Sequence, residues 1–330
     1  MGFNDILGND RIKRILRKAL QRERVPNSLL FSGPEGVGKI DFAQTLAQAL
    51  NCLELRDDAC GHCTSCIAIE KGNYPDVMRL VPEKEILKID QMRILKETAH
   101  LKPMLGKKRV FILERAERMN AEAANSLLKI LEEPPGFSHI VLSTDNPFVI
   151  LPTIKSRCQI LSFSPISRED IEGCLLEKGI EKSRAKVLSL LVRGNLRQAL
   201  SLDWKDVQAQ REKTWGMFQA LAFGRGTADL FKEYSSLPKK LLTEELGPAL
   251  EILTSFCRDV LLLQEKASPE FLMNPDYETE LREVSAQCSA DRILDLWNDI
   301  DNTLRALQRN LNAKLFISSL FLKPLENNHV

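Results

Sequence analysis

The segment Ser32–Ile40 has the residue types and spacing of a phosphate-binding loop. Glycines let backbone N–H groups close around phosphate oxygens, the following helix adds its dipole, and a lysine reaches the outer phosphates. The next position should carry a hydroxyl for Mg²⁺, and Ile40 stands there instead. Two interpretations stay open, a phosphate site that has lost its metal or a glycine-rich turn without a ligand, so binding of ATP and Mg²⁺ is unsettled. The candidate nucleotide-binding residues are Gly33, Gly36, Gly38 and Lys39.

The end of the apolar run Arg109–Leu113 is the second place where nucleotide chemistry could be supported. A P-loop ATPase needs a carboxylate there for Mg²⁺ and usually a second one that orients the attacking water. Glu114 could bind the metal, but Arg115 stands at the second position, and a guanidinium cannot act as a base. Together with Ile40, this substitution predicts that the chain does not hydrolyse ATP by itself.

Four cysteines form a separate candidate metal site, within a module at about residues 52–66. Three of them follow a C-x₂-C-x₂-C pattern and the fourth ends the preceding helical stretch. Four thiolates without a carboxylate suit tetrahedral Zn²⁺ in a closed structural site. An iron–sulfur cluster and a redox-active pair are the alternatives, and His62 is a possible substitute ligand. The candidate ligands are Cys52, Cys60, Cys63 and Cys66.

The composition limits the class of protein. The chain has 330 residues, 44% hydrophobic and 28% charged, with 46 basic and 45 acidic side chains. This balance excludes a disordered chain and a globally basic DNA binder. No uncharged apolar run reaches about 18 residues, and the start has no apolar signal core, so we expect a soluble cytoplasmic protein without a membrane partner. The basic N-terminal helix, from Arg11 to Arg24, is more simply a solvated face than a DNA-binding one.

The elements that must position these residues alternate in the first half of the chain. Near-continuous apolar runs predict parallel strands buried on both faces, and amphipathic stretches between them predict helices, so we expect a doubly wound α/β domain. The expected strands are Ser28–Ser32, Val77–Val81, Arg109–Leu113, His139–Thr144 and Gln159–Phe163. The expected helices between them lie near Phe42–Leu53, Asp90–Leu101 and Asn120–Leu131.

The second half of the chain has helical periodicity only. The α/β domain should end near Pro165, where Ser167 and Asp170 form a predicted capping box. Three short helices are expected next, and longer ones follow Trp204. The short ones are Ser167–Lys178, Lys182–Val192 and Asn195–Leu202, and the longer ones include Leu242–Gln264 and Asp291–Leu311.

Arg157 lies just before the last expected strand, after a helix that a double proline ends. Its guanidinium could form an ordinary surface ion pair or contact a phosphate held by a neighbouring protein. From the residues alone, the surface ion pair is the simpler interpretation.

The sequence "LLKILEEPP…LPTIKSRCQ", with "GPEGVGK" upstream, resembles the bacterial clamp-loader ATPase family of AAA+ proteins. The cysteine module between the P-loop and the second strand is also similar to that family. The resemblance covers about Phe3–Leu200, and the loss of the hydroxyl and of the second carboxylate makes the chain similar to members that do not hydrolyse ATP.

The resemblance implies an AAA+ fold in three domains. These are a nucleotide-binding-like α/β domain at 1–165, a helical lid at 166–204 and a helical collar for oligomerisation at 205–330. By the same resemblance Arg157 is an arginine finger that acts in trans, Thr144 is a first sensor and Arg197 a second sensor.

The implied function is assembly within the DNA polymerase III holoenzyme. The chain would help to load the sliding clamp onto primed DNA, with tau/gamma ATPase subunits and a delta subunit as partners and with primer–template DNA contacted through the complex. The alternative is an active ATPase motor subunit of the tau/gamma type.

Overall fold

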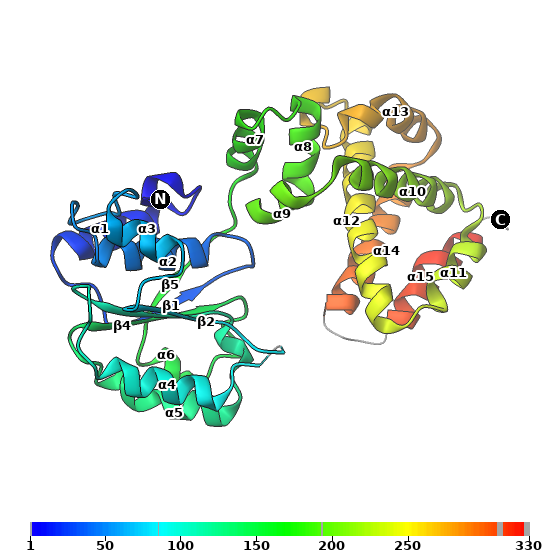
Figure 1. The fold of residues 1–330 in the computed structure, drawn as a ribbon. Helices are drawn as coiled ribbons and strands as arrows, with labels where there is room; N and C mark the ends of the chain where they lie inside the picture. The colour runs from blue at the N-terminus through cyan, green and yellow to red at the C-terminus, as the bar shows by residue number, and fades with distance from the viewer. Residues whose placement is uncertain (1, 85, 193, 309–312, 327–330) are drawn as a thin grey trace. The chain divides into compact units, whose positions relative to one another are not determined.

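The computed structural model describes residues 2–84, 86–192, 194–308 and 313–326, and its internal contacts divide the chain into two units (Figure 1). One unit is Met1–Ile171 with Arg193–Gln198, and the other is Glu172–Val192 with Ala199–Val330. The division into three domains at 1–165, 166–204 and 205–330 stays a prediction. Among the described helices, none is both long and apolar enough to span a membrane.

The first unit is built on a five-stranded parallel sheet with the order β2-β3-β4-β1-β5. β1, β3 and β4 are buried along their whole length, which is why their sequences are apolar runs. The predicted α/β sheet is therefore confirmed, with small changes at the strand ends. The strands are β1 (Ser28–Ser32), β2 (Val77–Leu80), β3 (Arg109–Leu113), β4 (Ser138–Thr144) and β5 (Gln159–Ser162).

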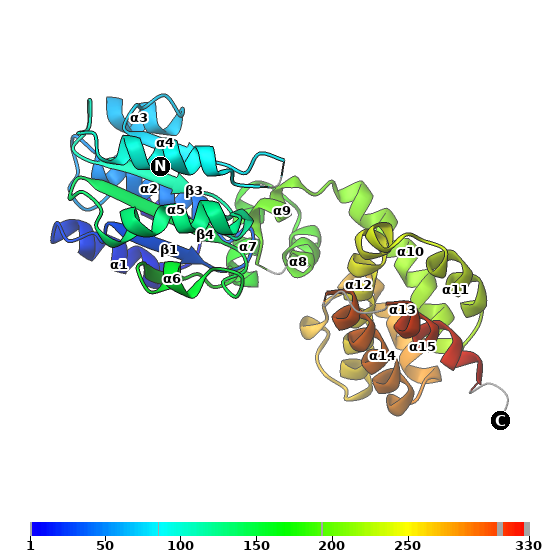
Figure 2. The ribbon, with the colours of Figure 1, turned by 90° about the horizontal axis from the view of Figure 1, so that it is seen from below.

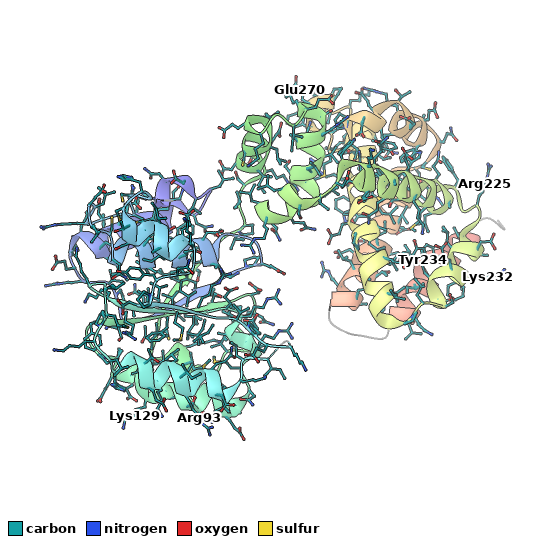
Figure 3. The ribbon with its side chains drawn as sticks, in the orientation of Figure 1. Arg93, Lys129, Arg225, Lys232, Tyr234 and Glu270 are labelled. Carbon is teal, nitrogen blue, oxygen red and sulfur yellow. The ribbon has the colours of Figure 1, made fainter. Side chains whose placement is uncertain are left out.

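Helices cover both faces of this sheet. Figure 1 shows α1, α2 and α3 on one face and α4, α5 and α6 on the other, and Figure 2 shows α4 and α5 side by side. In Figure 3, Arg93 of α4 and Lys129 of α5 project away from the sheet, as expected for the solvent sides of amphipathic helices. The helices are α1 (Asp10–Gln21), α2 (Lys39–Leu50), α3 (Thr64–Glu70), α4 (Ile89–Ala99), α5 (Ala121–Glu132) and α6 (Pro152–Lys155).

Three of these helices depart from the sequence prediction: α2 at its C-terminal end, and α3 and α6 because no helix was predicted there. α2 ends at Leu50, because the side chain of Asn51 turns back to the carbonyl of Ala47 and accepts the N–H of Lys108. Cys52 therefore lies beyond the helix rather than at its end. α3 was not expected, since it has only seven residues and begins within the cysteine run.

Among its described residues, the second unit contains helices joined by turns and loops and no strand, as predicted. Its core is formed around Phe218 and Phe256, with Trp215 packed edge-on against Phe256 at 5.1 Å between ring centroids. The helix expected at Asp291–Leu311 corresponds to α14, which is described for Ala290–Gln308. Leu311 lies outside the described residues. The helices after the sheet are α7 (Arg168–Glu177), α8 (Lys182–Leu191), α9 (Leu196–Ser201), α10 (Trp204–Phe223), α11 (Thr227–Ser235), α12 (Lys239–Gln264), α13 (Glu278–Gln287), α14 (Ala290–Gln308) and α15 (Ala313–Glu326).

A buried carboxylate, Asp76, fixes the loop between α4 and β3. It accepts the N–H groups of Met104, Leu105 and Gly106 at 2.7, 2.8 and 2.8 Å and bonds the guanidinium of Arg109 at 3.0 Å. Burial opposes ionisation, but the three N–H groups and the charge of Arg109 outweigh it and lower the pKa of Asp76. Asp76 therefore holds the loop through three backbone bonds and one ion pair.

We predict that Asp76→Ala lowers the free energy of unfolding by about 3–5 kcal/mol, because it leaves a buried guanidinium and three N–H groups without their acceptor. The pKa of Asp76 is lower in the folded state than in the unfolded state, so its stabilisation is present above about pH 4 and is lost as the pH falls through the folded pKa. Urea unfolding at several pH values measures both effects. Asp90→Ala is the control, since Asp90 forms only an exposed pair with Arg93, and an equal loss in both variants would contradict the prediction.

Candidate functional site

The predicted phosphate-binding loop connects β1 to α2 at the carboxyl edge of the sheet. Gly33 must lack a side chain, because a Cβ there would lie 2.5 Å from the carbonyl oxygen of Phe163. Gly36 has a left-handed φ of +77°, and a Cβ on it would overlap the side chain of Asn195. Gly38 directly precedes the first residue of α2. The glycines therefore have the backbone shape that the motif predicts.

The lysine of the loop is bonded within the protein. The Lys39 side chain is only 5% exposed, and its Nζ donates to the carbonyls of Gly33 and Pro34 at 2.7 and 2.5 Å and to Oδ1 of Asp145 at 2.6 Å. An ammonium has three donors, and all three have acceptors here. A phosphate would have to compete with these acceptors for Lys39.

The position after the lysine contributes to packing instead of metal binding. Ile40 is partly buried against the apolar core between the sheet and α2. An apolar side chain offers no ligand to Mg²⁺. Ile40 therefore packs against the core and cannot replace the hydroxyl that binds Mg²⁺ in a phosphate-binding loop.

The charged residues after β3 are paired with other parts of the same edge. Glu114, the carboxylate that the sequence predicts as a metal ligand, bonds the Arg79 guanidinium of β2. Arg115 has a left-handed backbone, and its Nη2 lies 3.2 Å from Oε1 of Glu35 in the phosphate-binding loop. The residue at the position predicted to orient a water is thus a cation paired with the loop.

The two predicted sensor residues lie at the same edge. Thr144 ends β4, is fully buried, and its hydroxyl accepts the N–H of Asn146. Arg197 is mostly exposed and lies 4.0 Å from Oδ1 of Asp41 in α2. Burial raises the pKa of Asp41, and the charge of Arg197 opposes this shift. Both residues are near the loop, as predicted, but each has a partner in the chain itself.

Arg157 lies apart from these residues, between α6 and β5. Its Nε and Nη2 both donate to Oε2 of Glu132 at 3.2 Å, and its Nη1 donates to the carbonyl of Thr153 at 3.1 Å. Glu132 is the last residue of α5, so the guanidinium is attached to the end of a helix that packs on the sheet.

The four predicted cysteine ligands converge. Their Sγ atoms all lie within 4.8 Å of one another, which is the arrangement that one tetrahedral ion requires. Backbone N–H groups point at three of the sulfurs, at 3.3 Å for Cys52 and Cys60 and 3.4 Å for Cys63. Burial opposes ionisation of Cys63, but the N–H groups of Leu53 and Cys66 and the thiols of Cys66 and Cys60 lower the pKa of that thiol to about 6.

The cysteine module is attached to the unit by a second set of bonds. Asp58 accepts the N–H of Phe3 at 2.9 Å and bonds the guanidinium of Arg17 in α1. Gln48 of α2 donates to the carbonyl of Cys66 at 2.9 Å. His62 pairs with exposed Glu54, with 2.7 Å from its Nε2 to Oε2, and a ring nitrogen of His62, a carboxylate oxygen of Glu54 and Sγ of Cys60 lie within 4.8 Å of one another. The donor set of four sulfurs fits a thiolate-bound metal, and His62 is not needed for it.

Several residues of the site were not predicted from the sequence, and the two with the largest consequence are Asp145 and Glu132. Asp145 is 106 positions from Lys39, and an acidic residue after a strand carries no signal of such a partner. Glu132 lies in the Leu-Glu-Glu-Pro-Pro segment next to Glu133. Which of these two carboxylates bonds Arg157 depends on where α5 ends, and the sequence does not fix that position.

Comparison with known proteins assigns most of the chain to one family. The family description "DNA polymerase III, delta subunit" matches residues 8–167, and "DNA polymerase III, delta subunit, C terminal" matches residues 209–324. The chain is 30% identical over 315 residues to DNA polymerase III subunit delta' of Bacillus subtilis, covering 94% of both proteins.

The chain also matches gamma and tau subunits of DNA polymerase III, over a smaller share of their length. The chain is 34% identical over 206 residues to DNA polymerase III subunit gamma/tau of Mycoplasma pneumoniae, covering 61% of this chain and 30% of that protein. Among solved structures, the RuvB Holliday junction branch migration motor of Thermotoga maritima is 15% identical, with a TM-score of 0.44, covering 99% of this chain and 89% of that one.

The parallel sheet, the glycine-rich loop after β1 and the matches to both delta-subunit models define a subunit of DNA polymerase III. Within that class, the chain belongs to the delta-prime family of DNA polymerase III clamp-loader subunits.

We predict that Lys39→Ala destabilises the chain in the absence of any nucleotide, by about 1–3 kcal/mol, because Asp145 and two carbonyls lose a buried donor. Urea unfolding without added nucleotide measures this loss. Lys129→Ala, which removes an exposed lysine on α5, is the matched control and should change stability by less than about 0.5 kcal/mol. Equal stability of Lys39→Ala and wild type would show that the Lys39 bonds contribute nothing to folding.

Proposed function

We propose that this chain serves clamp loading without hydrolysing ATP itself, by completing the ATP site of a neighbouring tau/gamma subunit with Arg157. In this role it is a subunit of the DNA polymerase III holoenzyme that helps to place the sliding clamp on primed DNA, together with tau/gamma and delta subunits. Primer–template DNA is contacted through the assembled complex.

The observation that carries the proposal is the bonding of Lys39. Its ammonium bonds Asp145 and two loop carbonyls instead of being exposed to a ligand. Ile40 in the core and Arg115 at the water-orienting position remove two further requirements of hydrolysis. The chain therefore lacks the groups for ATP hydrolysis in its own site. Its partly exposed Arg157 guanidinium could still act on the ATP site of another subunit.

Arg157 has the chemical properties that such a role needs. A guanidinium is always charged and planar, and it can donate two parallel hydrogen bonds to phosphate oxygens as charge develops on them. Its side chain is 29% exposed, so part of it can be reached by a partner.

An active motor of the tau/gamma type is the second candidate, because gamma/tau proteins match 61% of the chain at 34% identity. The loss of the hydroxyl at Ile40 and of the carboxylate at Arg115 weighs against it.

We also propose that the four clustered cysteines hold one structural zinc ion. A closed set of four thiolates, with no carboxylate among them and no open position for substrate, is typical of structural zinc. Such an ion would order the module at residues 52–66 and would take no part in reactions at the glycine-rich loop after β1.

For the arginine finger, we predict that Arg157→Ala leaves folding and complex assembly intact but lowers the turnover of the completed site by on the order of 10³-fold. The total ATPase activity falls less, because other sites in the complex keep their own fingers. Arg157→Lys should not restore turnover, since an ammonium cannot reproduce the planar fork. The measurement is clamp- and DNA-stimulated ATPase of the reconstituted complex, with Lys155→Ala as a nearby basic control. Wild-type turnover in a fully assembled Arg157→Ala complex would exclude the role in trans.

For the metal, we predict one zinc per chain in protein purified without chelator. Cys63→Ser should release it and loosen the module, while the helices and sheet persist because the cores on both faces of the sheet are extensive. Elemental analysis and limited proteolysis measure the two effects, and Cys174→Ser, outside the cluster, is the control. Iron in place of zinc, or undiminished zinc in Cys63→Ser, would contradict the assignment.

A further inference from the structure

The three nitrogens of the Arg157 guanidinium bond different groups of the chain. A guanidinium has five N–H groups, one on Nε and two on each terminal nitrogen. The Nε edge, shared with Nη2, is directed at Oε2 of Glu132, and Nη1 donates to the carbonyl of Thr153. The remaining contact within the chain is the longest, 3.4 Å from Nη1 to Oγ of Ser156.

Nη1 has two N–H groups and two acceptors, and its contact with Ser156 is the weaker of the two, so a phosphate oxygen could displace it. Among the described residues, Nη2 bonds Glu132, which uses one of its two N–H groups. Glu132 therefore holds the group from the Nε side, and the end between Nη1 and Nη2 is the edge at which a phosphate could bind.

Both holding groups belong to well-anchored elements. Glu132 ends α5, whose Leu127, Ile130 and Leu131 are buried in the core below the sheet. Thr153 lies in α6, next to the buried Ile154. A side chain as long as arginine has many rotamers in solution, and two fixed acceptors restrict them before any partner arrives.

We infer that Glu132 is a positioning residue for Arg157: its carboxylate orients the guanidinium so that the outer edge faces a neighbouring subunit's phosphate. This inference rests on the proposed role of Arg157. An exposed ion pair contributes little to folding, so the function of the pair lies in orientation rather than in stability.

The test uses the reconstituted complex with Glu132→Ala, Glu132→Gln and Glu133→Gln. Among the described residues, Arg157 bonds Glu132 and not its exposed neighbour, so Glu133→Gln is a control with the same chemistry one position away. We expect Glu132→Ala to lower the kcat of the completed site by about 10- to 100-fold, as misplacement of a reacting group does, with KM and assembly unchanged. Glu132→Gln, which keeps an acceptor oxygen, should recover part of the loss, and Glu133→Gln should behave as wild type.

A double-variant cycle separates positioning from a general structural effect. If Glu132 acts through Arg157, adding Glu132→Ala to Arg157→Ala causes no further loss of kcat. Additive losses, wild-type kcat in Glu132→Ala, or a higher kcat in that variant would each overturn the inference. If Arg157→Ala itself has no effect, the proposed function fails; if Arg157→Ala is inactive while Glu132→Ala is normal, only this inference fails.

Discussion

The arrangement of the carboxyl edge of the sheet depends on one buried ammonium. Lys39 joins the phosphate-binding loop, through the carbonyls of Gly33 and Pro34, to Asp145 at the start of the connection between β4 and β5. A buried charge is tolerated only when it is paired and fully bonded, and this one is. Lys39, which would bind phosphate in an ATPase, therefore has a structural role here. Through Asp145 it holds the segment between β4 and β5, in which Arg157 lies.

The parallel sheet explains why these distant segments meet. β1 lies between β4 and β5, and Ser32 is in register with both Thr144 and Ser162. The loop after β1 and the connection after β4 therefore begin at the same edge, whereas Arg157 precedes β5 at the other end of the strands. The same sheet thus separates the nucleotide-site remnant from the guanidinium that we propose to act on a neighbour. The cysteine module is attached elsewhere, through Asp58 to α1 and through Gln48 to α2.

Features that depend on local sequence could be predicted, and those that depend on long-range pairing could not. The strands were found because burial on both faces demands apolar runs, and the helix cap predicted at Ser167 was correct, since the Ser167 hydroxyl accepts the N–H of Asp170 at 3.0 Å. The cysteine cluster followed from spacing. α3 was missed because its cysteines and short length conceal any helical periodicity. The partners of Lys39 and Arg157 lie 106 and 25 positions away, and no rule of spacing relates acidic residues to cations at such separations.

The most direct test of the central claim, that the chain acts through a neighbour's site, is ATP turnover by the purified chain alone and after mixing with a tau/gamma ATPase subunit. We predict background turnover for the chain alone, and turnover in the mixture that exceeds the sum of the separate proteins. Steady turnover by the chain alone that disappears in Lys39→Ala would contradict the claim and would identify the chain as a motor subunit.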